Sequence, residues 1–156
     1  MKKDKDFLKQ AINISADNIK NGGGPFGAVI VKDGEVIAAT GNSVTNTNDP
    51  TAHAEVNAIR LAAKKLNTFD LSGCEIYSSC EPCPMCLGAI YWARIDKLYF
   101  AANKVDAKNA GFDDEFIYKE IDLPFEKRSL ETTQLMQDDA KKVFDTWIDM
   151  ENKTEY

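Results

Sequence analysis

Three clustered cysteines and the single histidine are the residues of this chain best suited to hold a metal ion. Cys80, Cys83 and Cys86 lie close together in the sequence, and the remaining cysteine, Cys74, precedes them. Thiolates at this spacing in a reducing compartment favour a metal site over disulfides. The sequence has no second cysteine cluster with which to complete a four-thiolate site, so His53 becomes the candidate for a further ligand.

A histidine, a nearby glutamate and two cysteines supply the parts of a catalytic metal centre. Two thiolates and one imidazole provide three ligands to a tetrahedral zinc ion and leave the fourth position to water, as catalytic zinc sites require. Zinc lowers the pKa of a bound water to roughly 7, and a carboxylate beside it can move protons to and from a substrate. We therefore predict one Zn²⁺ per subunit, held by His53, Cys83 and Cys86, with Glu55 as the catalytic proton shuttle.

Each of these residues also has a structural explanation. Cys80 can replace Cys83 as a ligand, but it precedes the predicted helix and lacks the helix N–H groups that stabilise a thiolate, so we interpret it as a buried thiol beside the site. Glu55 can simply complement a helix dipole. A purely structural zinc module that binds a protein partner is a further alternative. The combination of His53, Glu55 and a P-C-x-x-C motif favours a catalytic zinc.

Both ligand-bearing segments predict the start of a helix. Residues 49–50, Asp-Pro, supply a cap and a first-turn proline, so we expect His53 in the first turn of an alanine-rich helix. We expect Cys83 and Cys86 in the first turn of a second helix, over residues 84–93. Because two helix N-termini would then point at one metal, the first-turn side chains can converge on it.

The remaining patterns predict strands alternating with helices, and hence a three-layer α/β/α sandwich with a mixed five-stranded sheet. Asp-Gly at residues 33–34 is typical of a hairpin turn. The strands are expected over residues 26–31, 35–39, 75–79, 97–102 and, weakly, 132–135, and the other helices over residues 7–19, 113–119 and 138–151.

Length and charge limit the classes of function. The 156 residues, 44% hydrophobic and 28% charged, fit a single domain over 1–156. The formal net charge of −6 falls entirely within residues 79–156, which hold 10 basic and 16 acidic residues, so no large basic field is available to bind nucleic acid. With neither a signal peptide nor an apolar run of the roughly 20 residues that span a bilayer, we expect a cytoplasmic protein with no membrane contact.

Four stretches of the chain resemble the bacterial guanine deaminases, which belong to the cytidine-deaminase-like zinc nucleobase deaminases with the signature H-x-E followed by P-C-x-x-C. They are residues 23–34, 48–55, 79–94 and 110–121. The first three are partly shared with cytosine and tRNA-adenosine deaminases, and the fourth discriminates between them. The resemblance implies a cytidine-deaminase-like fold and the hydrolysis of guanine to xanthine and ammonia by a zinc-activated water.

The resemblance also implies roles for residues around the zinc. The amide of Asn42 suits a purine edge, and Asp114 can accept from guanine N–H groups or relay a proton to the leaving ammonia. Asp114 is otherwise a helix cap. Phe26 and Trp92 can stack on the ring or serve as core aromatics, and the backbone N–H of Ala54 can bond a substrate carbonyl.

Similar enzymes are homodimers that exchange their C-terminal segment. This implies that residues of about 130–156 are swapped between subunits and that Tyr156 covers the partner's site. A lid of aromatic and aliphatic side chains would exclude bulk water. Its members would be Phe144, Trp147, Ile148 and Tyr156.

Two related activities share the zinc chemistry. A tRNA-adenosine deaminase must hold an RNA hairpin with Lys and Arg, which the acidic C-terminal half disfavours. A cytosine deaminase differs by pocket shape, which the sequence does not reveal. We therefore expect a small-molecule substrate, guanine, and no nucleic-acid partner.

Overall fold

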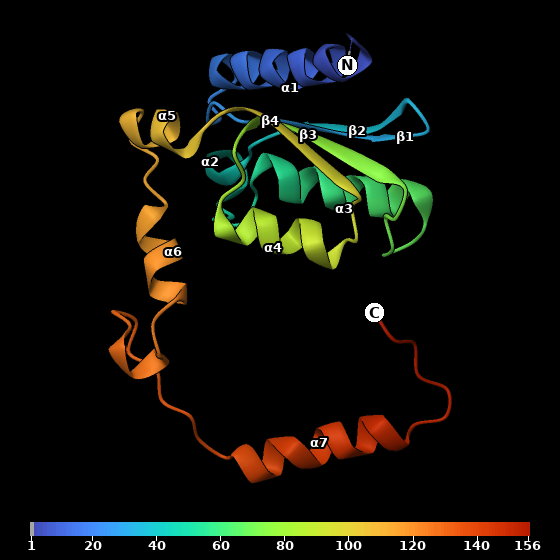
Figure 1. Cartoon of the computed structure of the whole chain (residues 1–156), viewed down its shortest axis with the longest axis vertical. Coiled ribbons are helices and arrows are strands. Elements are labelled where there is room, and N and C mark those ends of the chain that lie inside the picture. Colours follow the sequence, from blue (N-terminus) through green and yellow to red (C-terminus); the bar gives the residue numbers. More distant parts are fainter. Residues whose placement is uncertain (1) are drawn as a thin grey trace. The chain divides into compact units, whose positions relative to one another are not determined.

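The computed structural model describes residues 2–156, which form two compact units, one ending at Glu115 and one over Phe116–Tyr156. The first unit holds the sheet (Figure 1). Its four strands pair in the order β2-β1-β3-β4, with β1 antiparallel to β2 and β3, and β3 parallel to β4. The bounds are β1 (Gly27–Lys32), β2 (Glu35–Gly41), β3 (Cys74–Cys80) and β4 (Lys97–Ala102).

The sheet is mixed, as predicted, but the prediction of a fifth strand is wrong. Residues 132–135 have no regular structure and are exposed. Threonines favour strands only where a neighbouring strand offers its hydrogen bonds and a packing surface, and this segment has neither in its own unit. The predicted hairpin is confirmed, because Asp33 and Gly34 both adopt positive φ, of 51° and 79°, between β1 and β2.

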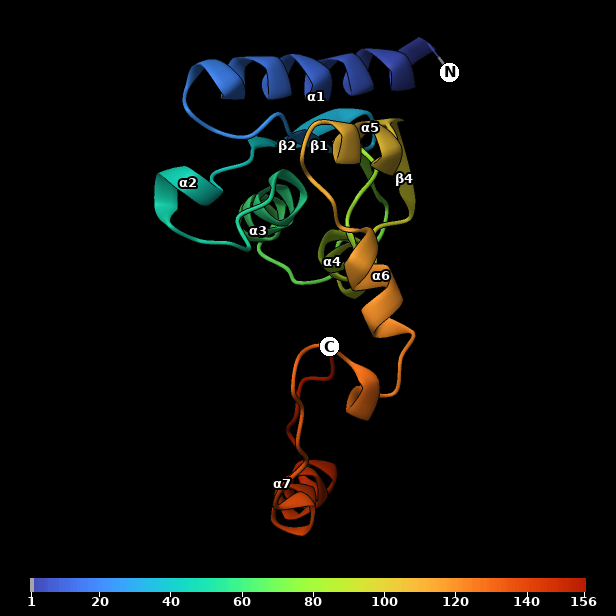
Figure 2. The ribbon, with the colours of Figure 1, turned by 90° about the vertical axis from the view of Figure 1, so that its left-hand side faces the viewer.

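Helices cover both faces of the sheet. Helix α1 (Lys2–Lys20) lies on one face, and α3 (Ala54–Leu66) and α4 (Pro84–Trp92) lie on the other (Figure 2). The first unit therefore has the expected three layers.

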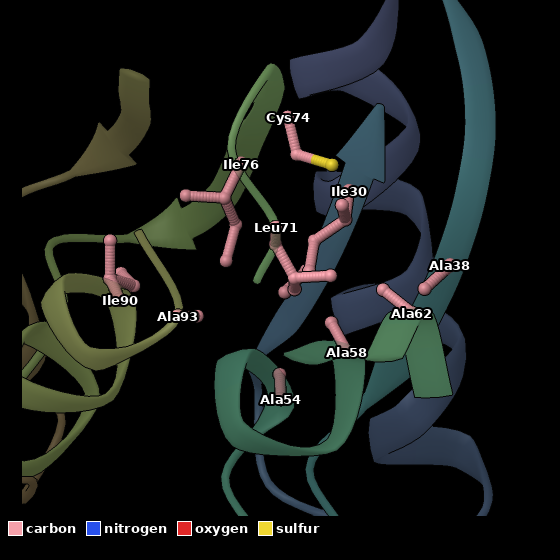
Figure 3. Close-up of a cluster of buried hydrophobic side chains, with 11 residues drawn as sticks. Ile30, Ala38, Ala54, Ala58, Ala62, Leu71, Cys74, Ile76, Ile90 and Ala93 are labelled. Atoms are coloured by element: carbon pink, nitrogen blue, oxygen red, sulfur yellow. The ribbon is translucent and has the colours of Figure 1, made fainter. Parts of the chain in front are cut away.

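The larger core cluster lies between the sheet and α3 and α4. Helix α3 presents Ala54, Ala58 and Ala62 at four-residue spacing, and these small, fully buried side chains let the helix approach the strands closely (Figure 3). Ile30 and Leu71 fill the space opposite. A second cluster, under α1, contains Ala11, Val29, Val31 and Tyr77. Both clusters fix the strands whose ends carry the candidate site.

Sequence analysis did not predict two short helices of the first unit. Helix α2 (Val44–Thr47) and helix α5 (Lys104–Asn109) are too short and too polar to show apolar periodicity. Helix α5 begins with a capping box, in which Asn103 Oδ1 accepts from the Asp106 backbone N–H at 3.1 Å and Asp106 Oδ2 accepts from the Asn103 backbone N–H at 2.9 Å. The helix expected over residues 113–119 is present as α6 (Glu115–Ile121), two residues later.

The second unit holds most of α6, the 3₁₀ turn η1 (Phe125–Lys127) and helix α7 (Gln137–Asp149), which confirms the helix predicted near residue 138. None of its described side chains is buried. Helix α7 exposes an apolar stripe at helical spacing, made of Val143, Phe144, Trp147 and Ile148. None of the helices within residues 2–156 is long and apolar enough to cross a membrane.

Candidate active site

His53 lies at the N-cap of α3, in an extended conformation with φ −68° and ψ 156°. The prediction that it belongs to the helix's first turn is therefore wrong by one residue, because the helix begins at Ala54. The Asp49 carboxylate accepts from the backbone N–H and the hydroxyl of Thr51, at 2.8 and 2.7 Å, and so closes a separate turn before the helix. His53 ends this turn.

The two predicted cysteine ligands flank the start of α4. Cys83 is its N-cap, with ψ 169°, one residue before the predicted first turn, and Cys86 lies in that turn. Pro84 occupies the first helical position, where its missing N–H costs nothing. Two helix N-termini thus meet at one point, as expected from the sequence.

The three side chains fit a zinc ion. His53 Nδ1 lies 3.6 Å from Cys83 Sγ and 3.4 Å from Cys86 Sγ, and all three ligand atoms lie within 4.8 Å of one another. A tetrahedron with Zn–S of about 2.3 Å and Zn–N of about 2.0 Å has S···N edges of about 3.5 Å. The donor set and its spacing therefore match a three-ligand zinc site.

The chemistry of the donors favours the thiolate form of Cys83. The Cys86 thiol, His53 and the backbone N–H of Cys86 all lower the pKa of Cys83. The hydrogen bond between His53 and Cys83 in turn raises the pKa of His53. Cys80 differs, because burial raises its pKa to about 11, and its Sγ lies 3.8 Å from the Asn103 carbonyl oxygen. Cys80 lies outside the group of three, in agreement with its interpretation as a buried thiol beside the site.

Glu55 lies in the first turn of α3 and is only 5% exposed. Its Oε1 accepts a hydrogen bond from the Ser78 hydroxyl at 3.0 Å, and its Oε2 lies 3.5 Å from Cys86 Sγ. Burial raises the pKa of this carboxyl group above its usual range. A carboxyl group that binds protons more readily, held beside the candidate ligands, suits proton transfer.

A cavity of about 580 Å³ opens beside these residues. His53, Glu55 and Cys83 line it together with Phe26, Asn42, Asp114 and the glycine loop Gly22–Gly24. Phe26 packs edge-on against Phe112, another lining residue, with ring centroids 4.9 Å apart at 84°. Burial raises the pKa of Asp114, with the Cys83 thiolate as the next cause.

Two asparagines that sequence analysis missed hold the rim of this cavity. The Asn18 amide, on α1, donates to the carbonyl oxygens of Gly24 and Asn42, at 2.8 Å each. The Asn57 amide, on α3, donates to the Gly41 carbonyl at 3.0 Å and to the Ser43 hydroxyl at 3.1 Å. The segment that carries Asn42 is thus tied to two helices. Neither asparagine stands in a motif, so only the fold reveals them.

The other predicted residues lie elsewhere. Ala54 is fully buried between His53 and Glu55. Trp92 ends α4, is 69% exposed, and is not among the described residues that line the cavity. Tyr156 ends the second unit and is 73% exposed.

The fold and the donor set define a zinc-dependent deaminase. Residues 1–102 match the family described as the cytidine and deoxycytidylate deaminase zinc-binding region. The chain belongs to this family.

Within it, the chain is similar to guanine deaminase of Bacillus subtilis, with 54% identity over 96% of this chain and 97% of the relative. The X-ray structure of that enzyme superposes with a TM-score of 0.95, covering 97% of this chain and 98% of the other. A guanine deaminase from Nitrosomonas europaea matches with a TM-score of 0.67 and 37% identity over 69% of this chain and 63% of its own. The tRNA-specific adenosine deaminase of Aquifex aeolicus is 47% identical over 67% of this chain and 68% of its own.

Proposed function

We propose that this protein hydrolyses guanine to xanthine and ammonia, a step in the breakdown of purine bases. The observation that carries the proposal is the 54% identity to a guanine deaminase over 96% of the chain, which includes the segment around Asp114 as well as the zinc motif. In the reaction, water adds a C–O bond at the ring carbon that bears the exocyclic amine, and the C–N bond to that amine breaks.

His53, Cys83 and Cys86 would hold one zinc ion per subunit. When bound there, zinc would supply a water of lowered pKa. Glu55 carries the protons: its Oε2, on the side of the ligand Cys86, accepts a proton from the attacking water, passes it to a ring nitrogen and later gives one to the departing amine. Burial raises the pKa of Glu55, which helps this carboxyl group to accept a proton.

The cavity walls would orient the base. Asn42 would bond the purine edge through its amide, and the Ala54 N–H would bond a carbonyl of the base. Asp114 would accept from N–H groups of guanine and take part in release of ammonia, while Phe26 would stack on the ring.

The charge of the cavity supports a small neutral substrate over RNA. Its described lining residues include the carboxylates of Glu55, Glu81, Asp113 and Asp114, and neither lysine nor arginine. A polyanion would meet repulsion there, since RNA binding relies on basic side chains along the phosphates. Four free cysteines, two of them needed as thiolate ligands, also fit a reducing compartment such as the cytoplasm.

A homodimer with exchanged C-terminal segments completes the proposal. The chain would form one functional domain over 1–156, with residues of about 130–156, including Phe144, Trp147 and Ile148, covering the partner's cavity beside Tyr156. The apolar stripe of α7 is exposed, in a unit without a buried side chain, which supports a role for this helix in binding the other subunit. Deleting residues 153–156 should lower guanine turnover while zinc content stays unchanged, and full activity after truncation would refute the lid.

A substrate panel tests the proposed function. The zinc-loaded protein is incubated separately with guanine, adenine, cytosine and a tRNA anticodon hairpin, and ammonia release is measured. We expect ammonia from guanine, in equal amount to xanthine. Ammonia only from cytosine or only from the hairpin would replace guanine with that substrate, and zinc binding without any turnover would favour a structural zinc module.

A further inference from the structure

Ser78 is a polar residue on a strand face that otherwise packs against the core. Side chains alternate along β3, and Cys74 and Ile76 belong to the core cluster beneath α3, whereas Tyr77 packs under α1. Ser78 therefore faces α3, and it is only 2% exposed. A hydroxyl buried on an apolar face is costly unless it is hydrogen-bonded. Its bond goes to Glu55 Oε1, at 3.0 Å.

The two oxygens of Glu55 have different partners. Oε1 accepts a hydrogen bond from the Ser78 hydroxyl, and Oε2 lies 3.5 Å from Cys86 Sγ. A cysteine binds metal as its thiolate, which has no proton to donate. With a metal bound, Cys86 would therefore no longer donate to Oε2, whereas the Ser78 hydroxyl would still donate to Oε1.

We infer that Ser78 is a positioning residue, whose hydroxyl holds Oε1 of Glu55 and thereby keeps Oε2 turned toward the reacting groups. The inference rests on the proposed role of Glu55 as proton shuttle. Without the hydroxyl, the carboxylate can rotate and its two oxygens become equivalent. Hydrogen bonds to charged groups are among the stronger ones, so the loss should lower kcat by about tenfold to a hundredfold.

The test compares Ser78→Val with Ser78→Thr. Valine and threonine have nearly the same shape, and threonine alone keeps a hydroxyl. We expect Ser78→Val to lower kcat by about tenfold to a hundredfold, with KM and zinc affinity within about twofold of wild type. Ser78→Thr should restore most of kcat. Ser78→Ala, which adds no volume, makes the same comparison should Ser78→Val not fold.

Ser79→Ala is the matched control. The Ser79 hydroxyl accepts a hydrogen bond from the Gly27 backbone N–H, on β1, at 3.0 Å, and not from one of the zinc ligands, so its loss should reduce stability and leave kcat within about twofold of wild type. Wild-type kcat in Ser78→Val or Ser78→Ala would overturn the inference, as would equal impairment of Ser78→Thr. The kcat of each variant is compared with that of the wild type on whichever aminated base the wild-type enzyme hydrolyses. A failure to hydrolyse guanine alone therefore counts against the proposed substrate and not against the role of Ser78.

Discussion

Asn18 joins helix α1 to two residues that line the cavity, Gly24 and Asn42, and its replacement by aspartate should lower stability. Its amide donates to Gly24 O and Asn42 O, at 2.8 Å each. A hydrogen bond contributes roughly 1 kcal/mol, so the loss of both costs about 2 kcal/mol. Asn18→Asp also places a carboxylate oxygen against two carbonyl oxygens. We expect a loss of about 2–3 kcal/mol in unfolding free energy, or about 4–12 °C in Tm, and a raised KM for guanine.

Asn13→Asp is the control for Asn18→Asp, since Asn13 is exposed on the same helix and the substitution adds the same charge. Urea unfolding of both variants with zinc bound, followed by steady-state kinetics, provides the comparison. If Asn18→Asp proved as stable as Asn13→Asp to within about 0.5 kcal/mol, the two hydrogen bonds would not hold the rim.

Three further predictions concern the site and its support. Glu55→Gln should keep the zinc content and lower turnover by about 10²–10⁴-fold, measured by elemental analysis and ammonia release; a loss of zinc instead would make Glu55 a structural residue. In metal-free protein, the lowered pKa of Cys83 should make it react with iodoacetamide already below neutral pH, whereas Cys80, with its pKa raised to about 11, should gain reactivity with each rise in pH up to that value. Both cysteines lie on the tryptic peptide of residues 66–94, so tandem mass spectrometry is needed to locate the modified residue within it, and zinc should protect Cys83. Gly27→Ala should cost at least about 2 kcal/mol, because its Cβ would lie 2.3 Å from the Ala11 carbonyl oxygen, whereas Gly88→Ala, in open space on α4, should raise stability by up to about 1 kcal/mol in urea unfolding.

The grouping of the three candidate zinc ligands could be predicted from the sequence because it depends on residue type and local spacing. Two predicted helix N-termini directed at one point were enough to group His53, Cys83 and Cys86, and the structure brings their ligand atoms together. The first residue of helix α3 was harder to predict, because the Asp49 side chain closes a turn with Thr51 and does not cap the helix as expected. Local hydrogen-bonding alternatives of this kind compete with helix formation at its first residues.

The contacts that support the site could not be predicted, because they join residues far apart in the chain. Ser78 meets Glu55 only through the packing of β3 against α3, and Asn18 meets Asn42 across 24 residues. The prediction of a strand at residues 132–135 was wrong for a related reason, because residues with strand propensity form a strand only beside another strand with which they can pair.

A zinc titration of the metal-free protein, with xanthine formation from guanine as the readout, tests the proposed chemistry most directly. We predict that turnover is absent without metal, rises in proportion to added zinc and levels off at one ion per chain. Undiminished xanthine formation by protein that elemental analysis finds free of metal, or none from protein whose site is filled, would contradict a catalytic zinc at His53, Cys83 and Cys86.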